Sequence, residues 1–143
     1  MNRLLLIEFD NEARSALKRE LNDAGYIVHA SDMSRTELEK AGEILARDGF
    51  DAIVIEPEMP LDELSNGPGA LSGLKLLAKW REQGLTLPPV IALTWRNYSY
   101  FFDDEQLYQY GIVCVVDKIN GSSSLLNALE CLQETQTETE EPK

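Results

Sequence analysis

Short apolar runs alternate with amphipathic stretches along the whole chain. The apolar runs, which predict strands, cover residues 4–7, 26–30, 52–55, 90–93 and 112–116. The stretches with apolar residues at helical spacing, which predict helices, cover residues 12–24, 34–48, 71–84, 103–110 and 122–134. This alternation is typical of parallel strands joined by crossover helices. We therefore expect an α/β fold in which a doubly wound, five-stranded parallel sheet has helices on both faces, giving three layers.

Several element ends carry recognisable signals. Gly25 follows the first predicted helix where a left-handed C-cap belongs, and Ser34 with Glu37 forms a capping box at the start of the second. Turn-forming residues make 61–72 a long loop, which either covers the strand ends or is a neutral insertion. Residues 135–143 are polar and acidic, so we expect one domain over 1–134 followed by a disordered acidic tail.

Composition narrows the class of partner. Thirteen Lys and Arg against 25 Asp and Glu give a net charge of −12, which repels polyanions and argues against direct nucleic-acid binding. No apolar run is long enough to span a membrane, and the N-terminus lacks a secretory h-region. We expect a cytoplasmic protein whose partner is another protein or a second copy of the chain.

The remaining chemistry-bearing residue types give little support for catalysis. Cys114 and Cys131 have no metal-ligand spacing, and we expect both in or near the core. His29, the one histidine, lies in a predicted strand without triad partners, so a structural role is favoured. The sequence contains no GxxxxGK[ST] or GxGxxG motif for nucleotide binding.

Polar residues follow four of the predicted strands. They are Glu8 and Asp10 after the first strand, Glu56 and Glu58 after the third, Thr94 after the fourth and Lys118 after the fifth. In an open parallel sheet the ligand-binding crevice lies outside the carboxyl ends of the strands. These residues therefore mark the candidate site.

Four stretches at these strand ends, residues 4–14, 51–60, 89–94 and 111–118, carry a resemblance. In this order and spacing they resemble the receiver domain of bacterial two-component response regulators, a CheY-like, flavodoxin-like fold, over residues 1–134. The resemblance implies an Asp after the third strand that accepts a phosphoryl group, and two acidic residues after the first strand that help hold Mg²⁺. It also implies a Thr or Ser and a Lys that contact the phosphoryl oxygens.

This chain departs from that pattern at its centre. Thr94 and Lys118 match the receiver positions, but Glu56 stands where the acceptor Asp belongs and Phe9 replaces the second acidic residue. An apolar ring supplies no oxygen ligand, so we expect Mg²⁺ binding to be lost or weak, and no other cofactor. The extra methylene of Glu56 displaces its carboxylate, to which in-line phosphoryl transfer is sensitive. The degenerate pocket comprises Glu8, Phe9, Asp10, Glu56, Glu58, Thr94 and Lys118.

These departures favour a pseudo-receiver without catalytic residues, a phosphorylation-independent interaction module of a bacterial signalling pathway. Glu56 either imitates a phosphoryl oxygen by reaching Lys118 and Thr94, giving a built-in active state, or has no signalling consequence. Two alternatives stay open. One is a working phosphoacceptor receiver of a two-component phosphorelay; the other is a metal-dependent phosphohydrolase built on Glu8, Asp10, Glu56 and Glu58.

Aromatic residues are concentrated between positions 95 and 110. Tyr and Trp offer large contact areas at a small entropy cost and are common in binding hot spots. We expect about half of these side chains to cover the core and the rest to form an interface. The candidate interface residues are Trp95, Tyr98, Tyr100, Phe101, Phe102, Tyr108, Tyr110 and Val115.

Overall fold

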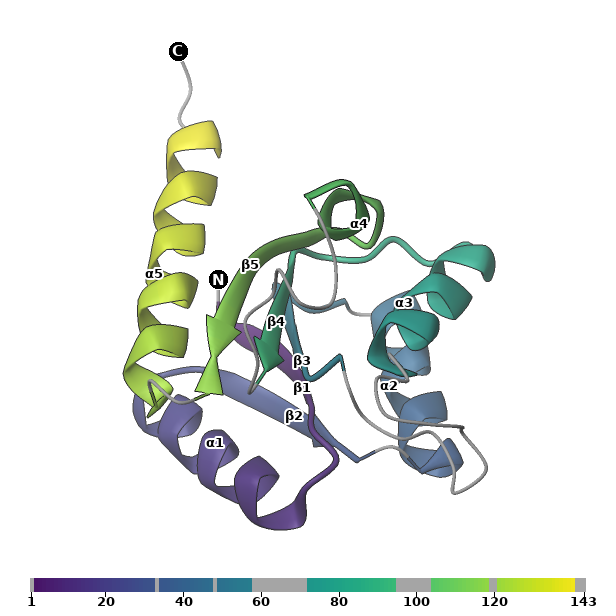
Figure 1. Cartoon of the computed structure of the whole chain (residues 1–143), viewed down its shortest axis with the longest axis horizontal. Coiled ribbons are helices and arrows are strands. Elements are labelled where there is room, and N and C mark those ends of the chain that lie inside the picture. Colours follow the sequence, from purple (N-terminus) through teal and green to yellow (C-terminus); the bar gives the residue numbers. More distant parts are fainter. Residues whose placement is uncertain are drawn as a thin grey trace.

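A parallel sheet forms the centre of the computed structural model, which describes residues 2–32, 34–47, 49–57, 72–94, 104–118 and 121–140 (Figure 1). Within these ranges the sheet has five strands in the order β2-β1-β3-β4-β5. The strands are β1 (Arg3–Ile7), β2 (Ile27–Ser31), β3 (Ala52–Ile55), β4 (Val90–Thr94) and β5 (Ile112–Asp117). The predicted fold class is confirmed.

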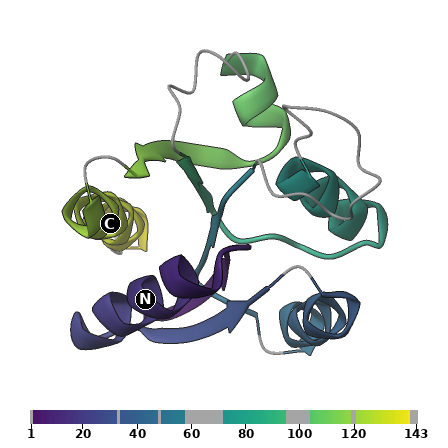
Figure 2. The ribbon, with the colours of Figure 1, turned by 60° about the horizontal axis from the view of Figure 1, so that its bottom comes forward.

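Helices lie on both faces of this sheet. They are α1 (Asn11–Asp23), α2 (Arg35–Arg47), α3 (Ser72–Glu82), α4 (Asp104–Gln109) and α5 (Gly121–Glu140). Helices α1 and α5 cover one face and α2 and α3 the other, while α4 lies next to β5 (Figures 1 and 2). The result is the expected three-layer arrangement.

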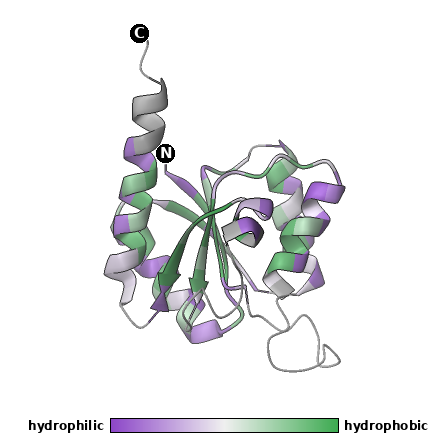
Figure 3. Ribbon diagram, turned by 45° about the horizontal axis from the view of Figure 1, so that its top comes forward, coloured by the Kyte–Doolittle hydropathy of each residue, from purple (hydrophilic) through white to green (hydrophobic). Residues whose placement is uncertain are grey.

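Each face of the sheet has its own core, because successive strand side chains point in opposite directions. Leu5 and Ile7 of β1 belong to the cluster under α2 and α3, whereas Leu4 and Leu6 belong to the cluster under α1 and α5. Burial on both faces explains why the central strands read as continuous apolar runs, which appear in green in Figure 3.

The helix-end signals are borne out in part. Gly25 has a φ of +100°, and the amide of Tyr26 donates to the Leu21 carbonyl at 3.1 Å, which closes α1 with a Schellman turn. At α2 only half of the predicted capping box forms. The Ser34 hydroxyl accepts from the Glu37 amide, but the Ser34 amide donates to Asp32 at 2.8 Å, so Asp32 takes the position expected for the Glu37 carboxylate.

Two expectations about the C-terminal part need correction. Helix α5 continues to Glu140, past the predicted end near Glu134 and into the stretch expected to be disordered. Its last residues contain no Gly or Pro that would end a helix before Pro142. Cys131 is exposed, whereas Cys114 is half-buried as expected.

None of the described helices is long and apolar enough to cross a membrane.

The predicted insertion, except for Ser72, lies outside the described residues, and so does Glu58. His29 is half-buried, and its ring lies 6.1 Å from that of Phe50. The Arg3 guanidinium lies over the Phe50 ring, 5.7 Å from its centre.

Candidate functional site

The carboxyl ends of the strands bring four of the predicted site residues to one edge of the sheet. Glu8 and Glu56 directly follow Ile7 and Ile55, which are paired in register between β1 and β3. Thr94 ends β4 and pairs with Asp117 of β5, and Lys118 follows. Residues of similar register in adjacent parallel strands point to the same face, so their side chains converge.

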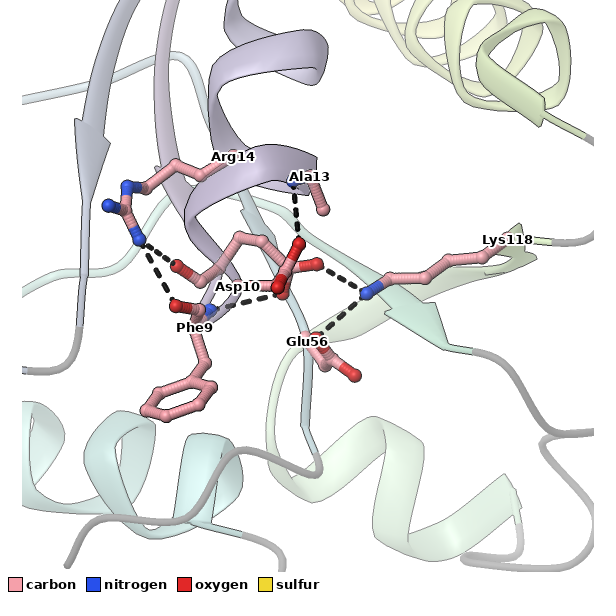
Figure 4. Close-up of polar contacts among 7 residues, drawn as sticks. Phe9, Asp10, Ala13, Arg14, Glu56 and Lys118 are labelled. Atoms are coloured by element: carbon pink, nitrogen blue, oxygen red, sulfur yellow. Dashed lines mark hydrogen bonds and ion pairs between the residues drawn. The ribbon is translucent and has the colours of Figure 1, made fainter.

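The Lys118 ammonium joins two carboxyl groups across this edge (Figure 4). Its Nζ lies 2.8 Å from Oε2 of Glu56 and donates a second hydrogen bond to Oε1 of Glu8. The three side chains are 8% (Lys118), 15% (Glu56) and 1% (Glu8) exposed, so water hardly screens them. The expected contact between Glu56 and Lys118 is confirmed, and Glu8 is a second partner that the sequence analysis did not foresee.

Burial dominates the electrostatics of this network. Desolvation, reinforced by the neighbouring Glu56 carboxyl group, raises the pKa of Glu8 from 4.5 to about 8 despite the opposing effect of Lys118. Burial alone would lower the pKa of Lys118, but the hydrogen bonds and charges of Glu56 and Glu8 outweigh it and raise that pKa above 10.5. Lys118 therefore remains a cation under all physiological conditions.

Phe9 points out of the pocket. The residue is 53% exposed, and its ring lies on the side away from Lys118 in Figure 4. Its amide donates to Oε2 of Glu8 at 3.1 Å, and its carbonyl accepts from Nη1 of Arg14 at 3.2 Å. The backbone is thus held on both sides, while the side chain offers the pocket no oxygen.

Asp10, predicted to belong to the pocket, caps a helix. Its Oδ2 accepts from the Ala13 amide at 2.8 Å, so the carboxylate satisfies a free donor in the first turn of α1. The Arg14 guanidinium also donates to the Glu8 carbonyl at 2.9 Å, which fixes the turn from β1 into α1. Thr94 is fully buried at the end of β4.

The donor set does not fit the Mg²⁺ ion of receiver domains. One predicted ligand position holds Phe9, Asp10 is engaged in the cap, and the carboxyl groups of Glu8 and Glu56 face an ammonium group. Mg²⁺ requires near-octahedral oxygen coordination, which these groups do not offer. Across the described ranges no cluster of three or more His, Cys, Asp or Glu side chains is arranged to hold a metal ion.

The structure describes three of the candidate interface residues. Tyr108 on α4 is 85% exposed, whereas Tyr110 and Val115 are half-buried and pack against the core under α2 and α3. Exposed Val113, which the sequence analysis did not include, lies at the register shift between β4 and β5. Trp95, Tyr98, Tyr100, Phe101 and Phe102 lie outside the described residues.

Gly73 in the first turn of α3 holds that helix directly against the backbone that carries Glu56. A Cβ atom at this position would lie 2.7 Å from the Glu56 carbonyl oxygen and 2.9 Å from Cα of Pro57. We expect Gly73→Ala to destabilise the fold by roughly 1–3 kcal/mol in urea denaturation. Alanine is the better helix former, so a stabilised variant would show that this approach can relax without cost.

Comparison with known proteins extends this picture at the level of the fold. No family model matches the sequence, and neither does any curated protein. The chain is similar to chemotaxis response regulator CheY4 of Vibrio cholerae, with 22% identity, a TM-score of 0.69 and coverage of 92% of this chain and 98% of that one. A CheY-like receiver domain from Methylobacillus flagellatus has 18% identity and a TM-score of 0.66, over 92% of this chain and 98% of that one.

The response regulator TrrA of Thermotoga maritima, solved in complex with Mg²⁺ and BeF, gives 22% identity and a TM-score of 0.66 over 92% of this chain and 99% of that one. TrrA has also been solved in complex with the histidine kinase ThkA. The sheet order, the two helical layers and these similarities lead to one conclusion. The chain has the CheY-like flavodoxin fold, and its structural neighbours are response regulator receiver domains.

Proposed function

We propose that this chain is an atypical receiver that signals by binding a protein partner without being phosphorylated. The observation that carries this proposal is the bridge from Lys118 to Glu8 and Glu56. In a receiver the equivalent edge of the sheet needs an acceptor Asp and a bound divalent cation. Here the resident cation is the Lys118 ammonium, which supplies the positive charge from within the chain.

The bridge also fixes the conformation that a partner would meet. Lys118 follows the last residue of β5, so its contacts tie the end of that strand to the ends of β1 and β3. A charge-assisted contact of 2.8 Å between Glu56 and Lys118 replaces the contact that a receiver makes through a phosphoryl oxygen. The pocket is thus held in one arrangement without a covalent modification.

Further observations favour a protein as the partner. The net charge of −12 disfavours nucleic acids. Exposed Tyr108 on α4 and Val113 on β5 provide apolar surface on neighbouring elements. A structural neighbour, TrrA, forms a complex with a histidine kinase, which makes a signalling protein the class of partner we favour.

The alternative of a working phosphoacceptor is tested with acetyl phosphate and Mg²⁺. We expect the intact mass of the chain to stay unchanged, because Glu56 is engaged by Lys118 and the pocket lacks a metal ligand at Phe9. A reactive receiver treated in parallel shows that the reagent is active. A phosphoryl adduct that disappears in Glu56→Gln would establish the working receiver, and catalytic release of phosphate would establish the phosphohydrolase.

A further inference from the structure

A groove lies between α2 and α3, on the face of the sheet opposite to α1 and α5. The two helices stand side by side over this face (Figure 2), and the groove between them has a volume of about 740 Å³. Ligand-binding clefts commonly fall in the range of about 300–1,000 Å³. The groove is separate from the network around Lys118, and none of the residues of that network lines it.

The floor of the groove is apolar and firmly held. It is formed by Leu38 of α2, by Leu76 and Trp80 of α3, and by Leu85 just after α3. Leu76 and Trp80 are nearly buried, at 6% and 4% exposed, so Leu38 and Leu85 supply most of the accessible apolar surface. The Leu85 amide donates to the Trp80 carbonyl at 3.1 Å, and Gly84 has a φ of +85°, so a Schellman turn fixes Trp80 and Leu85 together. A floor of this kind loses little conformational entropy when it is covered.

Gly42 brings α2 close to this floor. A Cβ atom at Gly42 would lie 3.2 Å from Nε1 of Trp80, so the indole ring packs directly on the backbone of α2. The width of the groove is thereby set by contacts between the helices themselves.

The walls of the groove carry charges of both signs. Arg35, Glu39 and Glu43 follow one another at intervals of four residues along α2, and Lys79 lies on α3. All four side chains are exposed, and within the described part of the chain none of them forms an ion pair. Glu39 and Glu43 are therefore two available carboxylates one helical turn apart.

We propose that this groove binds an amphipathic α-helix of a partner protein, whose apolar face packs on the partly exposed Leu38 and Leu85 and whose basic residues pair with Glu39 and Glu43. Basic side chains spaced one turn apart on the bound helix match the spacing of the two carboxylates. Lys79 on the opposite wall repels that basic edge and so sets the orientation of the helix. The net charge of −12 attracts a basic segment from a distance.

The proposal is tested by fluorescence anisotropy with a labelled peptide of about 18 residues, long enough to form a helix on binding. Leucines at helical spacing form its apolar face, and lysines line one edge. Glu39→Gln with Glu43→Gln removes the two carboxylates of the α2 wall and leaves Arg35 in place. Glu12→Gln with Glu20→Gln, on exposed positions of α1, is the matched control because it changes the net charge by the same amount. Thermal melts confirm that all variants are folded.

We expect saturable binding that weakens about fivefold or more in the groove variant and by less than about twofold in the control. A peptide of the same composition with scattered leucines should bind at least about tenfold more weakly, since it lacks the apolar face. Equal loss of affinity in both variants, or equal binding of the two peptides, would reduce the interaction to non-specific attraction and overturn the proposal. Absence of saturable binding would overturn it as well.

Discussion

Replacement of Lys118 by Met is expected to lower the free energy of unfolding by about 3–5 kcal/mol. Methionine keeps most of the length and apolar volume of the side chain, but it removes the ammonium group between Glu8 and Glu56. The two carboxyl groups, 1% and 15% exposed, would then share a pocket with little water and no counter-charge. Loss of one partner from a buried ion pair costs more than the pair itself contributes, because the remaining charge stays desolvated.

Lys40→Met provides the matched control for this experiment. Lys40 also pairs with a carboxylate, that of Glu37 at 3.4 Å, and the substitution changes the net charge equally. Its side chain, however, is 59% exposed, so we expect a loss of at most about 1 kcal/mol. Urea denaturation of both variants gives the two values. If Lys118→Met cost no more than Lys40→Met, the bridge would not hold the strand ends together.

A double variant separates the network from simple loss of packing. Glu8→Gln in the Lys118→Met background removes one of the two acidic groups and leaves an amide of the same shape. We expect it to recover part of the lost stability, about 1 kcal/mol or more, because the effects of substitutions within one network on the free energy of unfolding are not additive. A purely additive double variant would show that Glu8 and Lys118 do not interact energetically in the folded chain.

The strands were the part of the fold most readable from the sequence. Residues 52–55 form β3 as predicted, since a strand covered on both faces needs an unbroken apolar run. The end of α5 was not readable, because the last residues before Pro142 contain neither a Gly nor a Pro. Helix ends without such a signal depend on neighbouring contacts that a single sequence does not reveal.

The sequence predicted which residues meet at the candidate site, but it did not predict all of the contacts between them. Glu56 and Lys118 meet as predicted, because strand order brings their positions to one edge. The pairing of Glu8 with Lys118 was missed, since it depends on which way the chain turns after β1, and Arg14 fixes that turn by binding the Glu8 carbonyl. The role of Asp10 had a local signal that was overlooked: an Asp directly before a helix is a preferred N-cap.

The raised pKa of Glu8 leads to a stability that decreases with pH between about 4.5 and about 8. In this range the folded chain retains a proton on Glu8 that the unfolded chain has released, so folding binds a proton and becomes less favourable as the pH rises. The other shifted groups act elsewhere. The pKa values of Asp32 and Asp51 are lowered from 3.8, so these groups affect stability only at more acidic pH. The pKa values of Cys114, Tyr26 and Lys118 are raised from 9.0, 10.0 and 10.5, so these groups affect stability at more alkaline pH.

Glu8→Gln isolates this effect, because the amide imitates the protonated carboxyl group and does not titrate. Chemical denaturation at pH values of about 5 to 8.5 should show the wild-type chain losing on the order of 2 kcal/mol relative to the variant. The difference between the two proteins is the informative quantity, since every other group titrates in both. Parallel pH profiles would mean that Glu8 keeps its ordinary pKa in the folded chain. Lys118 would then be bridging two ionised carboxylates, and the pocket would carry one more negative charge at neutral pH.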